Sequence, residues 1–362
     1  MNHNRYALLD GIRGIAALFV VIRHTGEYWH FDVFRSYLAV DVFYILSGFV
    51  IAAAYESKMA SGSMGFKQFA LVRLIRLYPV YLLSVIVSTP RFFAKLIVDH
   101  HHHLDFATLM QACLAVVAGL FFIPFHMPGD ATLFPVNPVY WTLFFELLVN
   151  AIFAATRRML TEQVLRWVII VSGVLLAIQV HAHGNLNIGF LFSLRSVAEG
   201  LTRATFGIFF GLLLYRHKDI FTPFSFHAAR FSYWAIMVMM LILMSPATGS
   251  FDWLIDMLSV TLVFPVIVLL AAQNHHSRLL WLMLMLGSAS YPIYVLHVPI
   301  AGTVAFACRA LFGQGVDQFA PLSGIVLAST LVTISIWIEK YYDIPFRKWL
   351  SQRILASGKA GK

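Results

Sequence analysis

Cysteine and charge are both scarce in this chain of 362 residues. Its two cysteines, Cys113 and Cys308, each lie within an apolar stretch, so the sequence contains no disulfide framework and no cysteine spacing typical of a metal site. Charged residues make up only 12% of the chain, against roughly 25% in soluble domains. Apolar residues, by contrast, make up 60% and aromatic residues 15%. The composition therefore indicates an integral membrane protein that has the lipid bilayer as its partner.

Negative charge is the scarcer sign, and the formal net charge is +9. A basic chain can indicate nucleic-acid binding, but here the lysines and arginines gather at the ends of apolar segments rather than along one polar face. Such an excess of positive charge is typical of the cytoplasmic loops of membrane proteins. We therefore interpret the charge as a topology signal and expect no nucleic-acid partner.

The sequence also lacks the pattern of a removable signal peptide. Charged residues flank the first apolar run on both sides, and no small-residue cleavage site follows it. We expect the N-terminus to be retained.

Eleven apolar segments approach the length of about 20 residues that a helix needs to cross a bilayer. They lie at 8–28, 36–55, 74–96, 107–125, 138–156, 165–181, 188–215, 231–246, 253–272, 279–310 and 322–341. These segments predict an all-α fold, namely a polytopic bundle of transmembrane helices.

The loops between these segments differ in positive charge, and the charge orients the helices. Basic residues gather in the loops 56–76, 156–166, 216–218 and 273–278 and in the tail from residue 340. Lysine and arginine are lacking from 181–187 and 245–252. From residue 156 onward the alternation predicts six crossings, and the first two segments add two more.

Three apolar segments join the basic loops at 56–76 and 156–166, and an odd number can do so only if one of them turns back. The stretch 107–137 contains Pro124, Pro128 and Pro135, so we expect this segment to be re-entrant, because non-helical backbone at membrane depth requires a cavity lined by protein. The sequence thus predicts about ten spans plus one re-entrant segment, with both termini in the cytoplasm. Residues 1–350 are expected to form one transmembrane domain, and residues 351–362 a cytoplasmic tail.

The first apolar segment carries ionisable residues on one predicted helix face. Arg13 and His24 are 11 residues apart, so an α-helix places them on the same side, roughly 16 Å apart along the axis. Asp10 and Glu27 fall in the same sector of about 100°. A polar stripe on an apolar helix is expected to line a cavity. Within it, the His24 imidazole is the group best suited to exchange protons near neutral pH.

The same stretch has a recognisable motif. The sequence LDGIRGIAALFVVIRH, with an arginine, ten residues and then a histidine, resembles the N-terminal signature of the acyltransferase-3 family. This family comprises integral-membrane acyltransferases that include O-antigen acetylases and nodulation-factor acetylases.

Further motifs resemble this family in the same order along the chain. They are VDVFYILSGFVI (40–51), RLIRLYPVY (73–81), NPVYWTLFFE (137–146), SASYPIYVLHVPI (288–300) and YYDIPFRKWL (341–350). The resemblance extends from about residue 6 to residue 350. It implies a protein of the bacterial inner membrane, and we expect this chain to be the membrane module alone, without an esterase-like domain.

The resemblance implies transfer of an acyl group, usually acetyl, from a cytoplasmic coenzyme A thioester to a hydroxyl of an envelope carbohydrate or glycolipid. Such a reaction requires a base for the hydroxyl proton, cations for the phosphates of the coenzyme, and a site that excludes water. His24 is the candidate base, and transient acylation of His24 as a nucleophile is the alternative. Arg13 is the candidate phosphate ligand near the cytoplasmic face. We expect no metal.

Two further motif positions carry candidate site residues. Arg73 and Arg76 are neighbours on one helix face and suit a pyrophosphate, although they could instead be a positive-inside anchor. Glu146 either orients His24, or binds the acceptor sugar, or forms a structural pair with a distant arginine. Asp10, about one turn from Arg13, is expected to orient that arginine.

The remaining candidates concern acceptor binding, and the resemblance contributes Tyr78 and Trp141 to them. Arg195, Glu199 and Arg203 are spaced i, i+4, i+8, which predicts a charged ladder on one helix face, either for packing or for a substrate groove. His297 lies between two prolines and lines either the same cavity as His24 or the core. The run 100–103 consists of four histidines, but adjacent loop histidines rarely satisfy metal geometry.

A transporter or flippase for a polar solute or glycolipid is the alternative function, because buried ionisable residues in a polytopic protein also mark transport pathways. Transporters often contain repeated halves, which are not evident in this sequence. For an acyltransferase, we expect the coenzyme to approach from the inside and the sugar from the outside, with His24 in a connecting tunnel.

Overall fold

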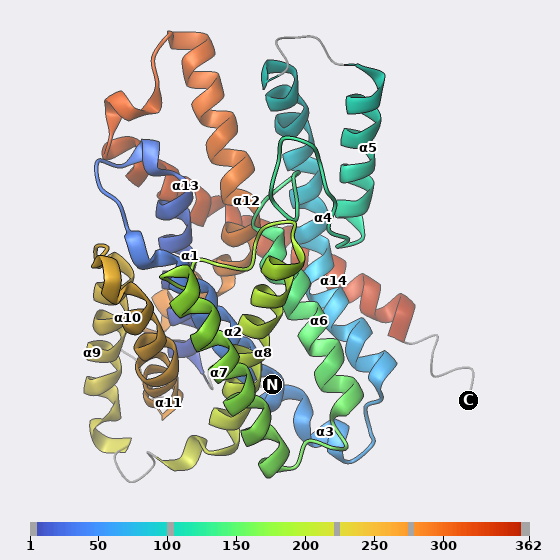
Figure 1. Ribbon diagram of the computed structural model, residues 1–362, viewed down its shortest axis with the longest axis vertical. Helices are drawn as coiled ribbons and strands as arrows, with labels where there is room; N and C mark the ends of the chain where they lie inside the picture. Colours follow the sequence, from blue (N-terminus) through green and yellow to red (C-terminus); the bar gives the residue numbers. More distant parts are fainter. Residues whose placement is uncertain (1–5, 100–104, 221–224, 274–278, 356–362) are drawn as a thin grey trace.

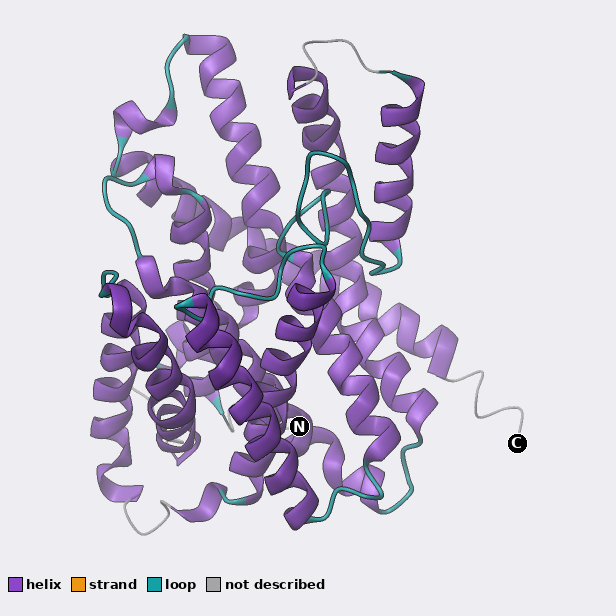
Figure 2. Ribbon diagram, viewed as in Figure 1, coloured by secondary structure: helices purple, strands orange, loops and turns teal. Residues whose placement is uncertain are grey.

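The computed structural model describes residues 6–99, 105–220, 225–273 and 279–355. Over these residues the chain is a bundle of helices, and no strand forms within them (Figures 1 and 2). The all-α fold predicted from the eleven apolar segments is confirmed for this part of the chain, because each segment overlaps a helix.

The helices follow one another with short connections. They are α1 (Ala7–His24), α2 (Ala39–Ile51), α3 (Ser57–Ala60), α4 (Phe66–Asp99), α5 (Phe106–Leu120), α6 (Tyr140–Thr156), α7 (Glu162–His183), α8 (Leu194–Arg216), α9 (Ser225–Met244), α10 (Asp252–Leu258), α11 (Phe264–Gln273), α12 (Leu280–Phe312), α13 (Leu322–Ile338) and α14 (Ile344–Leu350). Short π-helical turns join α2 to α3, α10 to α11 and α13 to α14.

Seven helical stretches within the described ranges are long and apolar enough to cross a membrane. They are Phe34–Ala60, Phe66–Asp99, Glu162–His183, Leu194–Arg216, Gly249–Gln273, Leu280–Phe312 and Leu322–Ile354. The chain is therefore a multi-pass membrane protein, while the count of ten spans stays a prediction. α1 lies outside this set, because its 18 residues include three charged ones, Asp10, Arg13 and Arg23.

Several element boundaries differ from the sequence prediction. α4 begins at Phe66 rather than at residue 74, so both Arg73 and Arg76 lie inside a helix, as their predicted place on one helix face requires. α1 ends at His24 rather than at residue 28, and a short 3-10 turn, Gly26–Tyr28, follows it. Glu27 therefore lies outside α1 and does not belong to the polar helix face on which its sequence position predicts it.

Residues 121–139, the proline-rich part of the predicted re-entrant segment, contain no regular helix. α5 runs beside only the upper part of α4, and this irregular segment follows it before α6 begins (Figure 1). Backbone hydrogen bonds attach the segment to the loop before α8: Leu133 N donates to Phe190 O at 2.9 Å, and Phe192 N donates to Ala131 O at 2.7 Å. The irregular backbone is thus partly satisfied by protein, as its placement at membrane depth would require.

Glycines permit the closest helix contacts. Gly287 of α12 lies directly against Asp10 of α1, and a methyl group at residue 287 would overlap that aspartate. Gly48 of α2 packs in the same way against the backbone of Ile208 in α8. Small residues at helix interfaces let membrane helices approach in this manner. The contact at Gly287 holds the polar face of α1 against α12.

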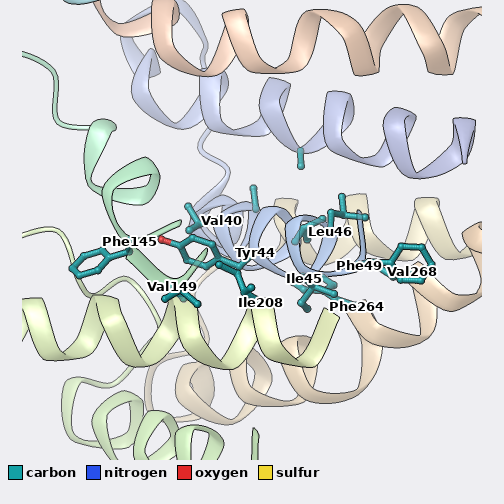
Figure 3. Packing of buried hydrophobic residues seen from close by; sticks show 14 of the residues in the cluster. Val40, Tyr44, Ile45, Leu46, Phe49, Phe145, Val149, Ile208, Phe264 and Val268 are labelled. Carbon is teal, nitrogen blue, oxygen red and sulfur yellow. The ribbon is translucent and has the colours of Figure 1, made fainter. Parts of the chain in front are cut away.

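The largest apolar core lies around α2 (Figure 3). Tyr44, Ile45 and Phe49 of this helix pack among Phe145 of α6, Ile208 of α8 and Phe264 of α11. The core therefore fixes α2, and Tyr44, together with Ser47 and Val50 of the same helix, also lines the site described next.

Candidate active site

A pocket opens between α1, α2, α4, α6 and α12, and three arginines line it. We call it the arginine pocket. Its lining includes Arg13 of α1, Ser47 of α2, Arg73 and Arg76 of α4, Glu146 of α6, and Ser290, Tyr291 and Tyr294 of α12. The cavity volume is about 150 Å³, the share of roughly five water molecules. The structure thus brings together four of the residues predicted from the sequence.

Arg13 is held firmly against α12. Its Nε donates to Ser290 Oγ at 2.9 Å, and its Nη2 donates to Gly287 O at 3.0 Å. The same Nη2 lies 3.1 Å from the carboxylate of Asp10, one turn earlier in α1. Asp10 is therefore placed where the sequence predicts it, beside the guanidinium that it is expected to orient.

Arg73 and Arg76 each face a carboxylate from another helix. Arg73 donates to Glu146 Oε1 at 2.5 Å, and Ser47 Oγ donates to the same oxygen at 2.6 Å. Arg76 lies 3.4 Å from Asp343, a residue that is 1% exposed. The hydrogen bonds of Glu146 thus go to Arg73 and Ser47, which matches the structural-pair alternative for this residue. Within the lining, Glu146 is the carboxylate that faces the guanidinium groups, while Arg13 and Arg76 also pair with Asp10 and Asp343, which are not among the lining residues.

His24 and His297 form a pair at the far end of α1. His297 Nε2 lies 3.1 Å from His24 Nδ1, and the two ring centroids are 5.1 Å apart. His297 is 0% exposed, whereas His24 is accessible at the end of its helix. His297 is therefore a direct contact of the candidate base, a role that the sequence alone does not specify.

Backbone carbonyls fix the proton positions in this pair. His24 Nδ1 lies 3.0 Å from Val20 O, and His297 Nδ1 lies 3.1 Å from Ile293 O. A carbonyl oxygen only accepts, so in the neutral pair each ring carries its proton on Nδ1. His24 Nδ1–H then donates to both Val20 O and His297 Nε2. This leaves the lone pair of His24 Nε2 free, and within the described residues that atom has no hydrogen-bond partner.

Two contacts fix the 3-10 turn that follows α1, near the histidine pair. Tyr28 donates its hydroxyl to Ala301 O of α12 at 2.5 Å. Arg309 of α12 lies 2.7 Å from Glu27. Together with the contacts of Arg13 to Ser290 and Gly287, these contacts attach the chain to α12 on both sides of His24.

Tyr294 connects the histidine pair with the arginine pocket. Its ring centroid is 6.3 Å from that of His297, and its hydroxyl lies 2.7 Å from Thr142 Oγ1, which also lines the pocket. Ser290, Tyr294 and His297 are spaced i, i+4, i+7 and therefore share one face of α12. Sequence reasoning missed Ser290 and Tyr294, although this spacing in the segment 288–300 could have identified them.

Several predicted acceptor contacts lie elsewhere. Trp141 is buried against Phe145 and beneath the Arg203 guanidinium. Tyr78 packs near the rings of Tyr81 and Phe122. Neither residue lines the arginine pocket.

The charged ladder predicted for α8 is only half correct. Arg195 lies 2.8 Å from Glu199, as its i, i+4 spacing predicts. Arg203, however, pairs with Asp41 of α2 at 2.7 Å, and both side chains are almost fully buried. The buried guanidinium selects a carboxylate that it can contact with two nitrogens, at Oδ1 and at Oδ2.

Metal-binding groups are not evident in the part of the chain that the structure describes: no three histidine, cysteine or acidic side chains gather there in a way that could hold an ion. The histidine run 100–103 lies outside the described residues. Cys113 and Cys308 are both free thiols.

Known proteins resemble this chain over most of its length. A family model described as an acyltransferase domain matches residues 6–340. "Exopolysaccharide production protein ExoZ" of Rhizobium meliloti (strain 1021) is 28% identical over 354 residues, 95% of this chain and 99% of that protein. "Protein 2 in picA locus" of Rhizobium radiobacter is 39% identical over 183 residues, 48% of this chain and 94% of that protein.

A shorter match covers one part of the chain. "Putative O-acetyltransferase SACOL0978" of Staphylococcus aureus (strain COL) is 34% identical over 89 residues, 24% of this chain and 14% of that protein. No solved structure matches the chain. The family resemblance carried by the sequence motifs is confirmed by the match over residues 6–340, and the chain is a membrane enzyme that belongs to the acyltransferase-3 family.

Proposed function

We propose that this protein is an O-acetyltransferase that moves an acetyl group from acetyl-coenzyme A to a hydroxyl group of an exported carbohydrate. The names of two relatives support this choice, since one refers to exopolysaccharide production and another to O-acetyl transfer. Membership of an acyltransferase family favours this activity over a transporter or flippase.

One observation carries the proposal. α1 and α12 both lead from the arginine pocket to the histidine pair: Arg13 contacts Ser290 at one end, and His24 contacts His297 at the other. Arg13 and His24 are separated by roughly 16 Å of helix rise. A donor that spans this length would place its phosphates near the arginines and its thioester near the imidazole.

The arginine pocket has the chemistry for the donor phosphates. Guanidinium groups bind phosphate oxygens through two parallel hydrogen bonds, and Arg13, Arg73 and Arg76 come from two helices that face each other across the pocket. The cavity of about 150 Å³ holds only the slender part of a coenzyme A thioester, so the adenine nucleotide would remain outside it.

His24 has the geometry of a general base. Its free Nε2 would accept the proton of the acceptor hydroxyl while the hydroxyl oxygen attacks the thioester carbonyl. A C–O bond forms, the C–S bond breaks, and the proton passes from His24 to the departing sulfur, which leaves as a thiol. During the reaction the imidazolium would be stabilised by two acceptors, Val20 O and His297 Nε2.

The membrane arrangement belongs to the same proposal. We expect ten crossings with both termini in the cytoplasm of a bacterial inner membrane, so that the donor approaches from the inside and the acceptor from the outside. The connections from α3 to α4 and from α6 to α7, two of the basic loops, lie together at the lower end of the molecule (Figure 1). This end would face the cytoplasm under the positive-inside rule.

Label transfer tests the proposal directly. The full chain in nanodiscs would be given acetyl-coenzyme A labelled in the acetyl group and a glycan fraction from a bacterial envelope. We expect alkali-labile label in the glycan with the wild-type protein and a loss of about 10²–10⁴-fold with His24→Ala, the usual contribution of a general base. Size-exclusion profiles that match the wild type would show that this variant is folded. No transfer by the wild type, or full transfer by His24→Ala, would refute the proposal.

A further inference from the structure

A second pocket lies between α4, α12 and the 3-10 turn after α1, and we call it the distal pocket. Its lining includes Glu27, Arg91, Lys95, Asp99, Thr303 and Arg309. Its cavity volume is about 490 Å³, within the roughly 300–1,000 Å³ usual for ligand sites. The motifs of the sequence do not include this pocket, and none of the catalytic steps above uses it.

The histidine pair lies between the two pockets. α1 contributes Arg13 to the arginine pocket, and the 3-10 turn after α1 contributes Glu27 to the distal pocket, with His24 between them in sequence. α12 contributes Tyr294 and then Thr303, with His297 between them. The two pockets are therefore on opposite sides of the candidate base, along the same two helices.

α4 follows the same order. It contributes Arg76 to the arginine pocket and Arg91 to the distal pocket. Between them, Ser84 donates to Val295 O, two residues before His297 in α12, at 2.5 Å. All three helices thus connect the pockets past the histidine pair.

Arg91 is the unusual residue of the distal pocket. Its guanidinium lies directly against the backbone of Gly302, where a methyl group would overlap it. Among the residues that the structure describes, no hydrogen bond or ion pair is made by this guanidinium. Arg309, by comparison, is paired with Glu27 at 2.7 Å. Lys95 lies one turn after Arg91 on the same helix face and also lines the pocket.

We infer that the distal pocket binds the acceptor glycan and that Arg91, assisted by Lys95, recognises a carboxylate of an acidic sugar. This inference rests on the acyltransferase function proposed above. A guanidinium without a protein partner provides paired donors for a carboxylate. Asp99 and Thr303 provide acceptors and a hydroxyl for neighbouring sugar hydroxyls. The acceptor would then present one hydroxyl toward His24 Nε2.

A lipid phosphate is the competing occupant, and the lining argues against it. Glu27 and Asp99 place two carboxylates in the same pocket, and these accept hydrogen bonds from sugar hydroxyls, whereas a phosphate group has only acceptor oxygens and offers them no donor. The three helices also lead from this pocket to the histidine pair, a connection that a structural lipid would not need.

The test compares an envelope glycan fraction before and after chemical reduction of its carboxyl groups to alcohols. With the full chain in phosphatidylcholine nanodiscs, we expect reduction to raise the KM for glycan at least tenfold and to leave the KM for acetyl-coenzyme A unchanged. Arg91→Gln should raise the KM for untreated glycan by the same factor and should show no further rise with reduced glycan.

Two more variants sharpen the comparison. Gly302→Ala places a methyl group where the Arg91 guanidinium lies, and because that side chain is flexible it should move without unfolding the protein, with the same effect as Arg91→Gln. Arg166→Gln removes a guanidinium of an exposed i, i+4 ion pair with Glu162 and should match the wild type. Glycan binding to the inactive His24→Ala protein repeats the comparison without turnover.

Any other outcome of these kinetic and binding experiments overturns the inference. Equal use of treated and untreated glycan, or an unchanged KM in Arg91→Gln, would remove the carboxylate contact. An Arg91→Gln effect that occurs only in nanodiscs with phosphatidylglycerol would assign the pocket to lipid. No transfer by the wild type to either glycan, combined with no coenzyme A binding, would instead refute the proposed function itself, and the inference would fail with it.

Discussion

The Nε2 atom of His297 lies 3.1 Å from the Nδ1 atom of His24, although 273 residues separate the two in the chain. His297 is fully buried and keeps its own proton on Nδ1 through Ile293 O, so its Nε2 can only accept. His24 is thereby held with its proton on Nδ1 and its reactive lone pair on Nε2. We infer that His297 is a positioning residue for the candidate base.

Replacing His297 by leucine should lower kcat and leave the KM for both substrates nearly unchanged. The change removes one acceptor from the imidazolium of His24, and a hydrogen bond to a charged group contributes about 1.5–3 kcal/mol, or roughly 10- to 150-fold in rate. His297→Gln keeps a carbonyl acceptor and should recover part of the loss. Steady-state kinetics of the two variants checks this, and equal rates in both would show that His297 only fills space.

The three arginines of the arginine pocket should determine donor affinity. Arg73→Gln and Arg76→Gln should each weaken coenzyme A binding about 10- to 100-fold, since each removes a charged contact with a phosphate. Acetyl-pantetheine lacks the phosphates, so neither variant should change its use as a donor. Titration calorimetry with coenzyme A and rate measurements with both donors check the assignment. Equal losses with the two donors would contradict a phosphate role.

The polar face of α1 could be predicted because it depends on a single helix. A spacing of 11 residues places Arg13 and His24 on one side whatever surrounds them. Arg73 and Arg76 are likewise neighbours by local geometry, and both line the pocket. Local periodicity therefore identified much of the candidate site.

The partners of these residues could not be predicted in the same way, because they come from helices that are remote in sequence. Arg13 contacts Ser290, and Arg76 faces Asp343. A helical wheel says which side of a helix is polar but not which neighbour meets it. Arg203 is a residue for which a prediction from one helix alone fails, because its partner is Asp41 of α2 and not Glu199 of its own helix.

Gly287 should be essential for the contact between α1 and α12. Gly287→Ala would place a methyl group on Asp10, and overpacking of this kind destabilises proteins by about 1–3 kcal/mol. Activity should also fall, because Gly287 O accepts from Arg13. Gly65→Ala is the matched control, since the space around that glycine is open. Thermal unfolding in detergent checks whether Gly287→Ala is less stable than Gly65→Ala. Equal melting temperatures for the two variants would contradict the prediction.

The membrane orientation can be measured with single cysteines. In a Cys113→Ala, Cys308→Ala background, Ser61→Cys lies in an exposed basic loop, and Ala247→Cys lies in an exposed loop without lysine or arginine. We expect a membrane-impermeant maleimide to label Ser61→Cys only in inverted vesicles and Ala247→Cys only in right-side-out vesicles. Labelling of both from the same side would contradict the predicted alternation.

Substitutions of Glu146 distinguish two roles for this residue, one through Arg73 and one through His24. If it acts on the donor through Arg73, Glu146→Gln should keep turnover within a few-fold, because the amide oxygen still accepts from Arg73 and Ser47. Loss of the negative charge should then leave coenzyme A binding equal or tighter, since the pocket becomes more positive. Glu146→Ala should weaken binding, because Arg73 loses its anchor. If Glu146 instead acts on His24, Glu146→Gln should lower kcat by about 10²-fold or more without changing donor affinity. The contacts at 2.5 and 2.6 Å favour the first result, and kcat measured beside the coenzyme A dissociation constant decides between them.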